Sequence, residues 1–202
     1  MIGIKKLYIL LVRSESVVSK IVRFFTWDKY THTAINLNDN LYDFYSFARK
    51  QPDKVFPAGM CKEYLTEGLY RKHPKTPCAL YELEVSDEAY EFIGNKINEM
   101  WCRESEYHYN ILGMLLCRFS IPVRRPNHFF CSQFVGRLLN ESGALKLPKN
   151  SELMRPVDYS KLSELKQLYL GDIGGLLTRY HARLAEKSEK ETELVAAAKL
   201  VV

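Results

Sequence analysis

The clearest periodic signal in the first half of this chain is that of β-strands. Residues 4–12 are predicted to form a strand that ends in the apolar run 7–12, and apolar and polar residues alternate over 31–37, 41–47 and 79–85. Asn38-Asp39-Asn40 is a turn signal between the second and third of these segments. The pattern predicts an antiparallel sheet in which 31–37 and 41–47 form a hairpin.

Helical spacing of apolar residues appears between and after the strands. It predicts a first helix over 17–25, and Ser86 can cap a second one that has two acidic residues in its first turn. A third helix should begin at Cys131 and stop near Gly143, because Phe134, Val135, Leu138 and Leu139 then share one face. Shorter helices are predicted over 107–116 and 160–168.

Prolines concentrate in residues 50–78, where they stand at positions 52, 57, 74 and 77. This composition predicts a long and mostly irregular excursion, and long loops in compact domains often cover a substrate. No internal repeat or long linker divides the chain. We therefore expect one α+β domain over 1–180, with an antiparallel sheet packed against helices, followed by a C-terminal helical tail over 181–202.

Composition limits the classes of function. The chain has 202 residues, of which 47% are hydrophobic, so it can bury one good core. Its net charge of +5 is scattered and no nucleic-acid-binding module is recognisable, so no nucleic acid is expected as a partner. The apolar run 7–12 is too short to span a bilayer, which predicts no stable membrane insertion. The pattern predicts no cofactor, and it does not choose an oligomeric state.

The five cysteines include no closely spaced pair, which indicates a reduced, cytoplasmic protein. Cys131 stands apart because it opens a helix after a basic stretch that contains Arg124 and Arg125. Unpaired backbone N–H groups and the positive end of the helix dipole favour a thiolate there, and a thiolate is the reactive nucleophile. The alternative is that Cys131 has a purely structural role, as a small hydrophobic side chain buried in the core.

His32 is the candidate base for this nucleophile. It lies in a strand whose hairpin partner can supply a third group to orient the ring. If the hairpin centres on Asp39, Ser46 is a neighbour of His32 on the same face, and a shift of one residue brings Asp43 there instead. A carboxylate also stabilises an imidazolium, so Asp43 is the better chemical candidate. The register stays open from the sequence.

In this order the motifs resemble the circularly permuted NlpC/P60 branch of papain-like enzymes, which includes the YiiX-like and lecithin:retinol acyltransferase-like families. The resemblance covers roughly residues 4–180 and implies a papain-like fold, with Cys131 as nucleophile, His32 as base, and Asp43 or Ser46 as the third residue. YiiX-like members place a glutamate at that third position, and this chain departs from them there. The matching segments are Phe25-Thr26, Tyr30 to Ile35, Tyr45-Ser46-Phe47, Tyr107 to Asn110, and Phe130 to Val135.

The resemblance and the residues together predict a cysteine hydrolase, of peptidase or amidase type. It would cleave an amide or ester in a small peptide or acyl substrate, and peptides derived from the cell wall are one class of such substrates. Two alternatives use the same fold: an acyltransferase that works through the same Cys-His site, and a catalytically silent ligand-binding module. A third alternative is a metal site that uses Cys61, His73 and Cys78, although their spacing is unlike that of structural zinc sites.

Overall fold

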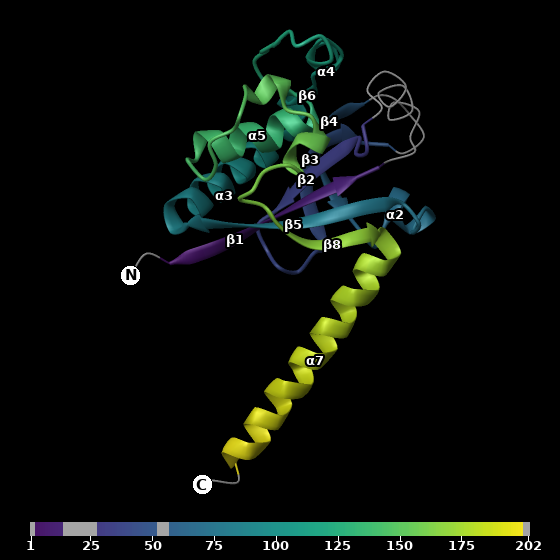
Figure 1. Ribbon diagram of the computed structural model, residues 1–202, viewed down its shortest axis with the longest axis vertical. Coiled ribbons are helices and arrows are strands. Elements are labelled where there is room, and N and C mark those ends of the chain that lie inside the picture. The colour runs from purple at the N-terminus through teal and green to yellow at the C-terminus, as the bar shows by residue number, and fades with distance from the viewer. Residues whose placement is uncertain (1–2, 14–27, 52–56, 200–202) are drawn as a thin grey trace.

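The computed structural model describes residues 3–13, 28–51 and 57–199 (Figure 1). The helix expected over 17–25 lies outside these residues. Within them the protein is a mixed α+β structure, which confirms the predicted class.

One curled sheet of eight strands forms the centre of the molecule. Its order is β7-β6-β4-β3-β2-β1-β5-β8, and neighbouring strands are antiparallel except for β6 and β7. The strands are β1 (Ile4–Val12), β2 (His32–Asn36), β3 (Asp43–Arg49), β4 (Ala58–Tyr64), β5 (Pro77–Ser86), β6 (His108–Tyr109), β7 (His128–Phe129) and β8 (Lys166–Asp172).

Alternate residues of β1 serve two different hydrophobic clusters, as the two-residue period of a strand requires. Leu7, Ile9 and Leu11 belong to the cluster that includes α3 and α5, whereas Tyr8, Leu10 and Val12 belong to the cluster that includes the start of α7. All six are buried. The helices are α2 (Gly68–Lys72), α3 (Asp87–Cys102), α4 (Ile111–Cys117), α5 (Cys131–Glu141), α6 (Pro156–Tyr159) and α7 (Ile173–Lys199), with short 3₁₀ turns at Glu104–Glu106 and Ser151–Leu153.

Local signals located several of these elements correctly. β1 has the predicted bounds, and the side chain of Ser86 accepts a hydrogen bond from the Ala89 N–H to cap α3. α5 begins at Cys131 as expected. A strand's apolar run and a helix cap are encoded within a few neighbouring residues, so such features can be recognised without knowing the fold.

The predictions for residues 50–78 and 160–168 were wrong. The stretch 50–78 contains β4 and α2, because β4 pairs with β3 along its whole length and its buried residue Met60 joins the main core. The helix predicted over 160–168 ends before that range, since Pro156 starts α6 early and residues 166–172 form β8 on the edge of β5. In both cases pairing with a distant strand overrides a weak local pattern.

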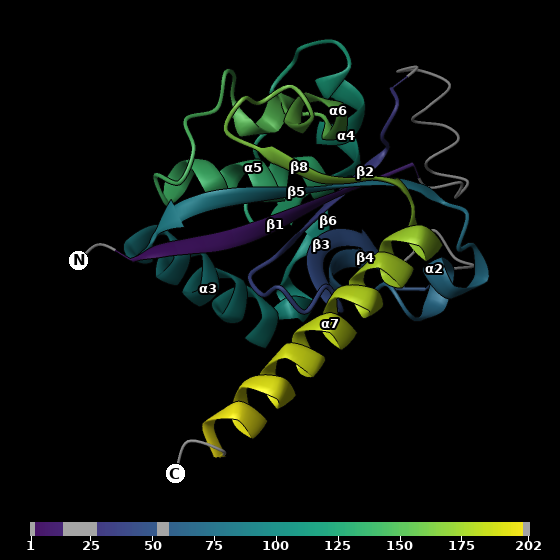
Figure 2. The ribbon, with the colours of Figure 1, turned by 60° about the horizontal axis from the view of Figure 1, so that its bottom comes forward.

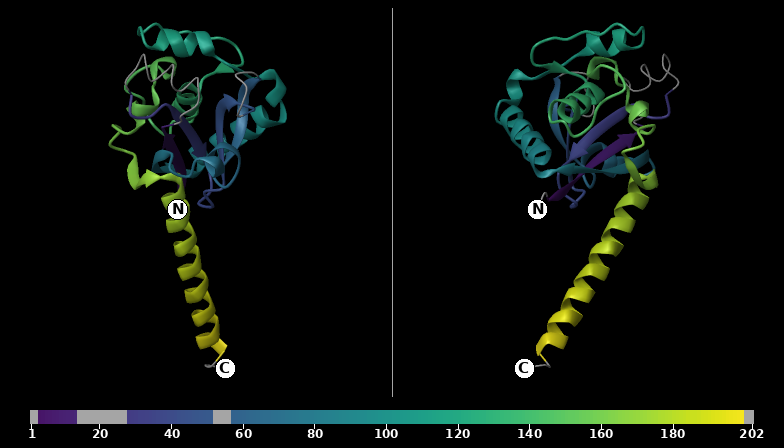
Figure 3. Two further views of the ribbon diagram at one scale, coloured as in Figure 1. Left: turned by 90° about the vertical axis from the view of Figure 1, so that its right-hand side faces the viewer. Right: turned by 60° about the vertical axis from the view of Figure 1, so that its left-hand side comes forward.

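The chain ends in the long helix α7. Its first turns bury Ile173, Leu176 and Tyr180, and the side chains of 181–190 are exposed. The expected boundary at residue 180 therefore falls inside a continuous helix. Figures 2 and 3 show α7 extending away from the sheet. No helix in the described part of the chain is long and apolar enough to cross a bilayer.

Candidate active site

Cys131 is the first residue of α5 and is 4% exposed. Two hydrogen bonds hold the next residue in place: the Ser132 hydroxyl donates to the Met154 carbonyl at 2.7 Å, and the Tyr159 hydroxyl donates to the Ser132 carbonyl at 2.6 Å. The Gln133 side chain accepts a hydrogen bond from the Phe130 N–H at 3.3 Å. These contacts fix the first turn of α5, and with it the position of the thiol.

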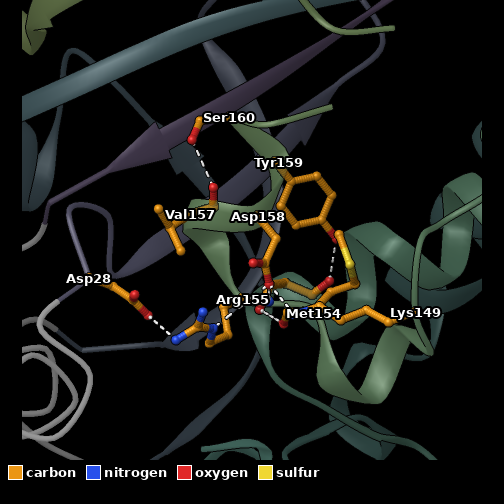
Figure 4. Close-up of polar contacts among 9 residues, drawn as sticks. Asp28, Lys149, Met154, Arg155, Val157, Asp158, Tyr159 and Ser160 are labelled. Atoms are coloured by element: carbon orange, nitrogen blue, oxygen red, sulfur yellow. Dashed lines mark hydrogen bonds and ion pairs between the residues drawn. The ribbon is translucent and has the colours of Figure 1, made fainter. Parts of the chain in front are cut away.

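The segment that braces this turn is itself held by charges (Figure 4). Asp158 accepts hydrogen bonds from the Arg155 N–H and pairs with the Lys149 ammonium, each at 2.7 Å. The Arg155 guanidinium lies 3.3 Å from Asp28, just upstream of β2. The cluster therefore ties the loop that carries Met154 to the segment that leads into the histidine strand.

His32 begins β2, where it is paired with Val12 of β1. Its Nε2 lies 2.7 Å from Oε1 of Glu63, and each side chain is 13% exposed. The imidazole also hydrogen-bonds the Cys131 thiol. Since Nε2 is engaged by Glu63, Nδ1 is the ring nitrogen left for the thiol. His32 thus lies between a cysteine and a carboxylate.

The charges of this trio reinforce one another. Burial alone would lower the pKa of His32, but the negative charge of Glu63 and the hydrogen bonds to Cys131 and Glu63 outweigh it and hold that pKa well above 6.5. Burial would likewise raise the pKa of Glu63, yet the charge of His32 and its hydrogen bonds leave that pKa below 4.5. The carboxylate therefore stabilises the positive charge that His32 carries once it has accepted a proton.

Glu63 is held from its other side as well. The Tyr70 hydroxyl of α2 donates to Oε2 at 2.7 Å, and the Cys61 thiol lies 3.7 Å from Oε1. Burial and the nearby charge of Glu63 raise the pKa of Tyr70 well above 10, so its hydroxyl stays protonated as a donor. The carboxylate therefore has a fixed orientation toward His32.

A fourth side chain reaches the thiol. The Tyr109 hydroxyl hydrogen-bonds Cys131 and lies 3.3 Å from the sulfur of Met114. Burial and the neighbouring sulfur raise the pKa of Tyr109 well above 10, so it too remains a hydroxyl donor. Tyr109 also lines an open cleft of about 840 Å³, whose other lining residues are Pro57, Ala58, His108, Ile111, Leu112, Leu115, Arg125 and His128. A ligand in this cleft would approach the thiol past Tyr109.

The structure brings Cys131 and His32 together but does not bring Asp43 or Ser46 to the imidazole. Asp43 pairs with Lys62 at 2.7 Å, and the buried Ser46 hydroxyl donates to the Thr33 carbonyl at 2.8 Å. The orienting carboxylate comes from β4, in the segment expected to be irregular. Ala58–Tyr64 shows no regular alternation of apolar and polar residues, so no local pattern marked the strand that carries this glutamate.

The alternative metal site has no support in the geometry. Among the residues that the structure describes, no group of three or more His, Cys, Asp or Glu side chains is placed to hold a metal ion. Cys61 lies beside Glu63, and Cys78 is buried on β5, where burial raises the pKa of its thiol to about 12.

The His32–Glu63 pair should give the protein a pH-dependent stability. Because the folded-state pKa of His32 is raised, its contribution is complete below 6.5 and is lost as the pH rises through the folded value. Because that of Glu63 is lowered, its contribution is complete above 4.5 and is lost as the pH falls through the folded value. Urea unfolding should therefore show the largest difference between the wild type and Glu63→Gln from pH 4.5 to 6.5. A difference that is constant from acid to alkaline pH would contradict the pairing.

No family model, curated protein or solved structure matches this chain. The fold and the site define an α+β protein in which a cysteine at a helix start, a histidine, a glutamate and a tyrosine meet beside an open cleft.

Proposed function

We propose that this protein is a cysteine hydrolase that cleaves an amide or ester, with a papain-like, permuted NlpC/P60 type of site. The observation that carries the proposal is the placement of His32 between the Cys131 thiol and the Glu63 carboxylate. A nucleophile, a base and a group that orients the base are the three parts that nucleophilic acyl transfer requires.

Each residue has a defined part in the proposed reaction. His32 takes the proton from the Cys131 thiol, and the thiolate attacks the substrate carbonyl to form a tetrahedral oxyanion. The Cys131 N–H, at the open end of α5, is available to that oxyanion. Collapse of the intermediate breaks the C–N or C–O bond, and His32 returns its proton to the leaving group. Water then hydrolyses the thioester by the same route in reverse order, which releases the acid and restores the thiol.

Glu63 and Tyr109 assist the reaction at different residues: Glu63 acts on His32, and Tyr109 acts on the Cys131 sulfur. Glu63 keeps the His32 proton on Nε2, so that Nδ1 faces the thiol, and stabilises the imidazolium that forms. Tyr109 donates toward the sulfur from the wall of the cleft, where it can stabilise negative charge on the thiolate or on the attacked carbonyl. A small peptide or acyl substrate fits a cleft of about 840 Å³.

Competitive alkylation tests the activation of the thiol. The protein is treated at pH 7 with substoichiometric iodoacetamide, and the label on each cysteine is quantified by peptide mass spectrometry. Cys102 is exposed and Cys131 is buried, so accessibility alone would label Cys102 first. We expect Cys131 to label faster than Cys102, because a histidine base contacts the Cys131 thiol, whereas the partner of the Cys102 thiol is the Asn98 amide.

The reverse order, with Cys102 ahead of Cys131, would count against an activated nucleophile. Rapid labelling of Cys131 without turnover of any ester or amide would favour the silent ligand-binding module instead.

A further inference from the structure

The exposed apolar side chains of this protein are unevenly distributed. Of the ten large hydrophobic residues that are exposed on the described part of the chain, four lie within 112–121: Leu112 at 51%, Leu115 at 44%, Phe119 at 71% and Ile121 at 48%. Scattered single hydrophobic residues are normal on a surface, but a contiguous group marks an interaction site. We call these four residues the α4 patch.

The α4 patch is displayed by a defined turn. After α4 the N–H groups of Phe119 and Ile121 both donate to the Leu116 carbonyl, at 2.9 and 3.1 Å. The Ser120 N–H donates to the Cys117 carbonyl at 3.1 Å. These hydrogen bonds hold Phe119 and Ile121, the last two residues of the patch, on the outside of the turn, where both are exposed.

The charged residues next to the α4 patch in the sequence have one sign. Residues 107–140 contain no aspartate or glutamate, while they carry Arg118, Arg124 and Arg125, and also Arg137, which pairs with Glu141. Arg124 and Arg125 follow the turn directly and are exposed. An apolar surface with a basic rim complements a surface that is apolar inside and anionic at its boundary.

The patch also has a distinctive position. α4 and the connection after it form the extremity of the molecule opposite to the free end of α7 (Figures 1 and 3). The cleft beside Tyr109 is lined from this side by Leu112 and Leu115, which belong to the patch, and by Arg125. A flat partner that contacts Leu112 and Leu115 at this extremity would therefore lie beside the cleft.

We propose that the α4 patch docks the protein on the surface of an anionic phospholipid bilayer. The apolar side chains would enter the boundary between headgroups and acyl chains, and the arginines would contact the headgroups. A second copy of this chain is a poorer occupant, because a two-fold contact through the patch would place its arginines against their own copies. The proposal goes beyond the hydrolase assignment and does not depend on it.

Vesicle flotation of the full-length chain tests the docking. One set of vesicles is phosphatidylcholine alone, and the other is about seven parts phosphatidylcholine to three parts phosphatidylserine. We expect the protein to float with the anionic vesicles and not with the neutral ones. Binding should weaken as the salt concentration rises, because the basic rim is screened.

Two variants and two matched controls locate the contact. Phe119→Ser combined with Ile121→Ser, neither of which lines the cleft, should reduce partitioning about tenfold or more, since each side chain loses its apolar burial in the bilayer. Arg124→Ala should reduce it about fivefold. The controls are Leu170→Ser, a leucine of β8 that is 54% exposed, and Lys187→Ala, an exposed lysine of α7, the helix that extends away from α4 (Figure 1). Both controls should bind as the wild type does.

The absence of flotation with anionic vesicles would overturn the proposal, and so would equal losses in the patch variants and their controls. Light scattering without lipid tests whether a second copy of the chain occupies the patch instead. If the wild type is a dimer, the double variant is a monomer and the protein does not float with vesicles, the patch is a dimer interface. Iodoacetamide labelling of Cys131 in the same samples separates this result from the hydrolase proposal, because the patch variants should label normally whether or not they bind vesicles.

Discussion

Replacement of Cys131 by alanine should reduce hydrolysis of an activated ester such as p-nitrophenyl acetate to the uncatalysed rate. The nitrophenolate group of this ester leaves readily without catalysis, so the rate of hydrolysis reports the reactivity of the nucleophile even when the natural substrate is unknown. The wild-type protein should also release a burst of nitrophenol as the thioester forms, and this burst should vanish in the variant. The measurement is stopped-flow absorbance at nitrophenolate wavelengths.

The matched control is Cys102→Ala, which removes an exposed cysteine and should leave both burst and turnover unchanged. Cys131 is a small side chain at the start of a helix, so its loss should leave far-ultraviolet circular dichroism unchanged and alter stability by about 1 kcal/mol. A folded Cys131→Ala protein that retains the burst would show that another thiol is the nucleophile.

Glu63→Gln should lower ester hydrolysis by about 10²-fold or more, whereas Asp43→Asn should change it little. The glutamine is similar in shape but lacks the charge that stabilises the imidazolium, and it cannot accept hydrogen bonds from His32 and Tyr70 on both of its terminal atoms. Asp43→Asn weakens the pair with Lys62 and leaves the contacts of His32 in place. Steady-state kinetics of the two variants, each checked for folding, gives the ranking.

A second readout distinguishes positioning from general destabilisation. Because the charge of Glu63 raises the pKa of His32, Glu63→Gln should lower that pKa, and nitrogen-detected NMR of the imidazole measures it directly. In Asp43→Asn the His32 titration should not move. If instead Asp43→Asn lowered both the activity and the His32 pKa, the sequence-based choice of Asp43 as the orienting residue would be restored.

The parts of the site that were predictable are those encoded locally. The position of Cys131 at a helix start could be predicted from the apolar face of the helix that follows it. The position of His32 in a strand could be predicted from the alternation of apolar and polar residues around it. Glu63 could not be placed in this way, since its contact with His32 depends on the pairing of β4 with β3 and on Tyr70 of a separate helix. The hairpin register, with Ile35 opposite Tyr45, likewise follows from packing across the whole sheet and not from the turn residues.

The position of Tyr109, like that of Glu63, depends on strand pairing and could not be predicted from its neighbours in the sequence. Its stretch was expected to be helical, but His108 and Tyr109 form β6, which pairs with β4 at Gly59 and with β7 at His128. A β-carbon at Gly59 would lie 2.3 Å from the Tyr107 carbonyl oxygen, so this close approach requires a glycine. A two-residue strand of this kind is defined by its hydrogen bonds to neighbouring strands, and two residues are too few to show a sequence pattern that predicts it.

The order of the site residues along the chain has a consequence for biosynthesis. His32 and Glu63 lie on β2 and β4, and Cys131 follows them much later, at the start of α5. During synthesis from the N-terminus, the base and its carboxylate emerge before the thiol exists. The nucleophile thus meets its base only once β6, β7 and α5 have joined the sheet, so a nascent or truncated chain carries an ordinary cysteine, and the reactive thiol belongs to the finished fold.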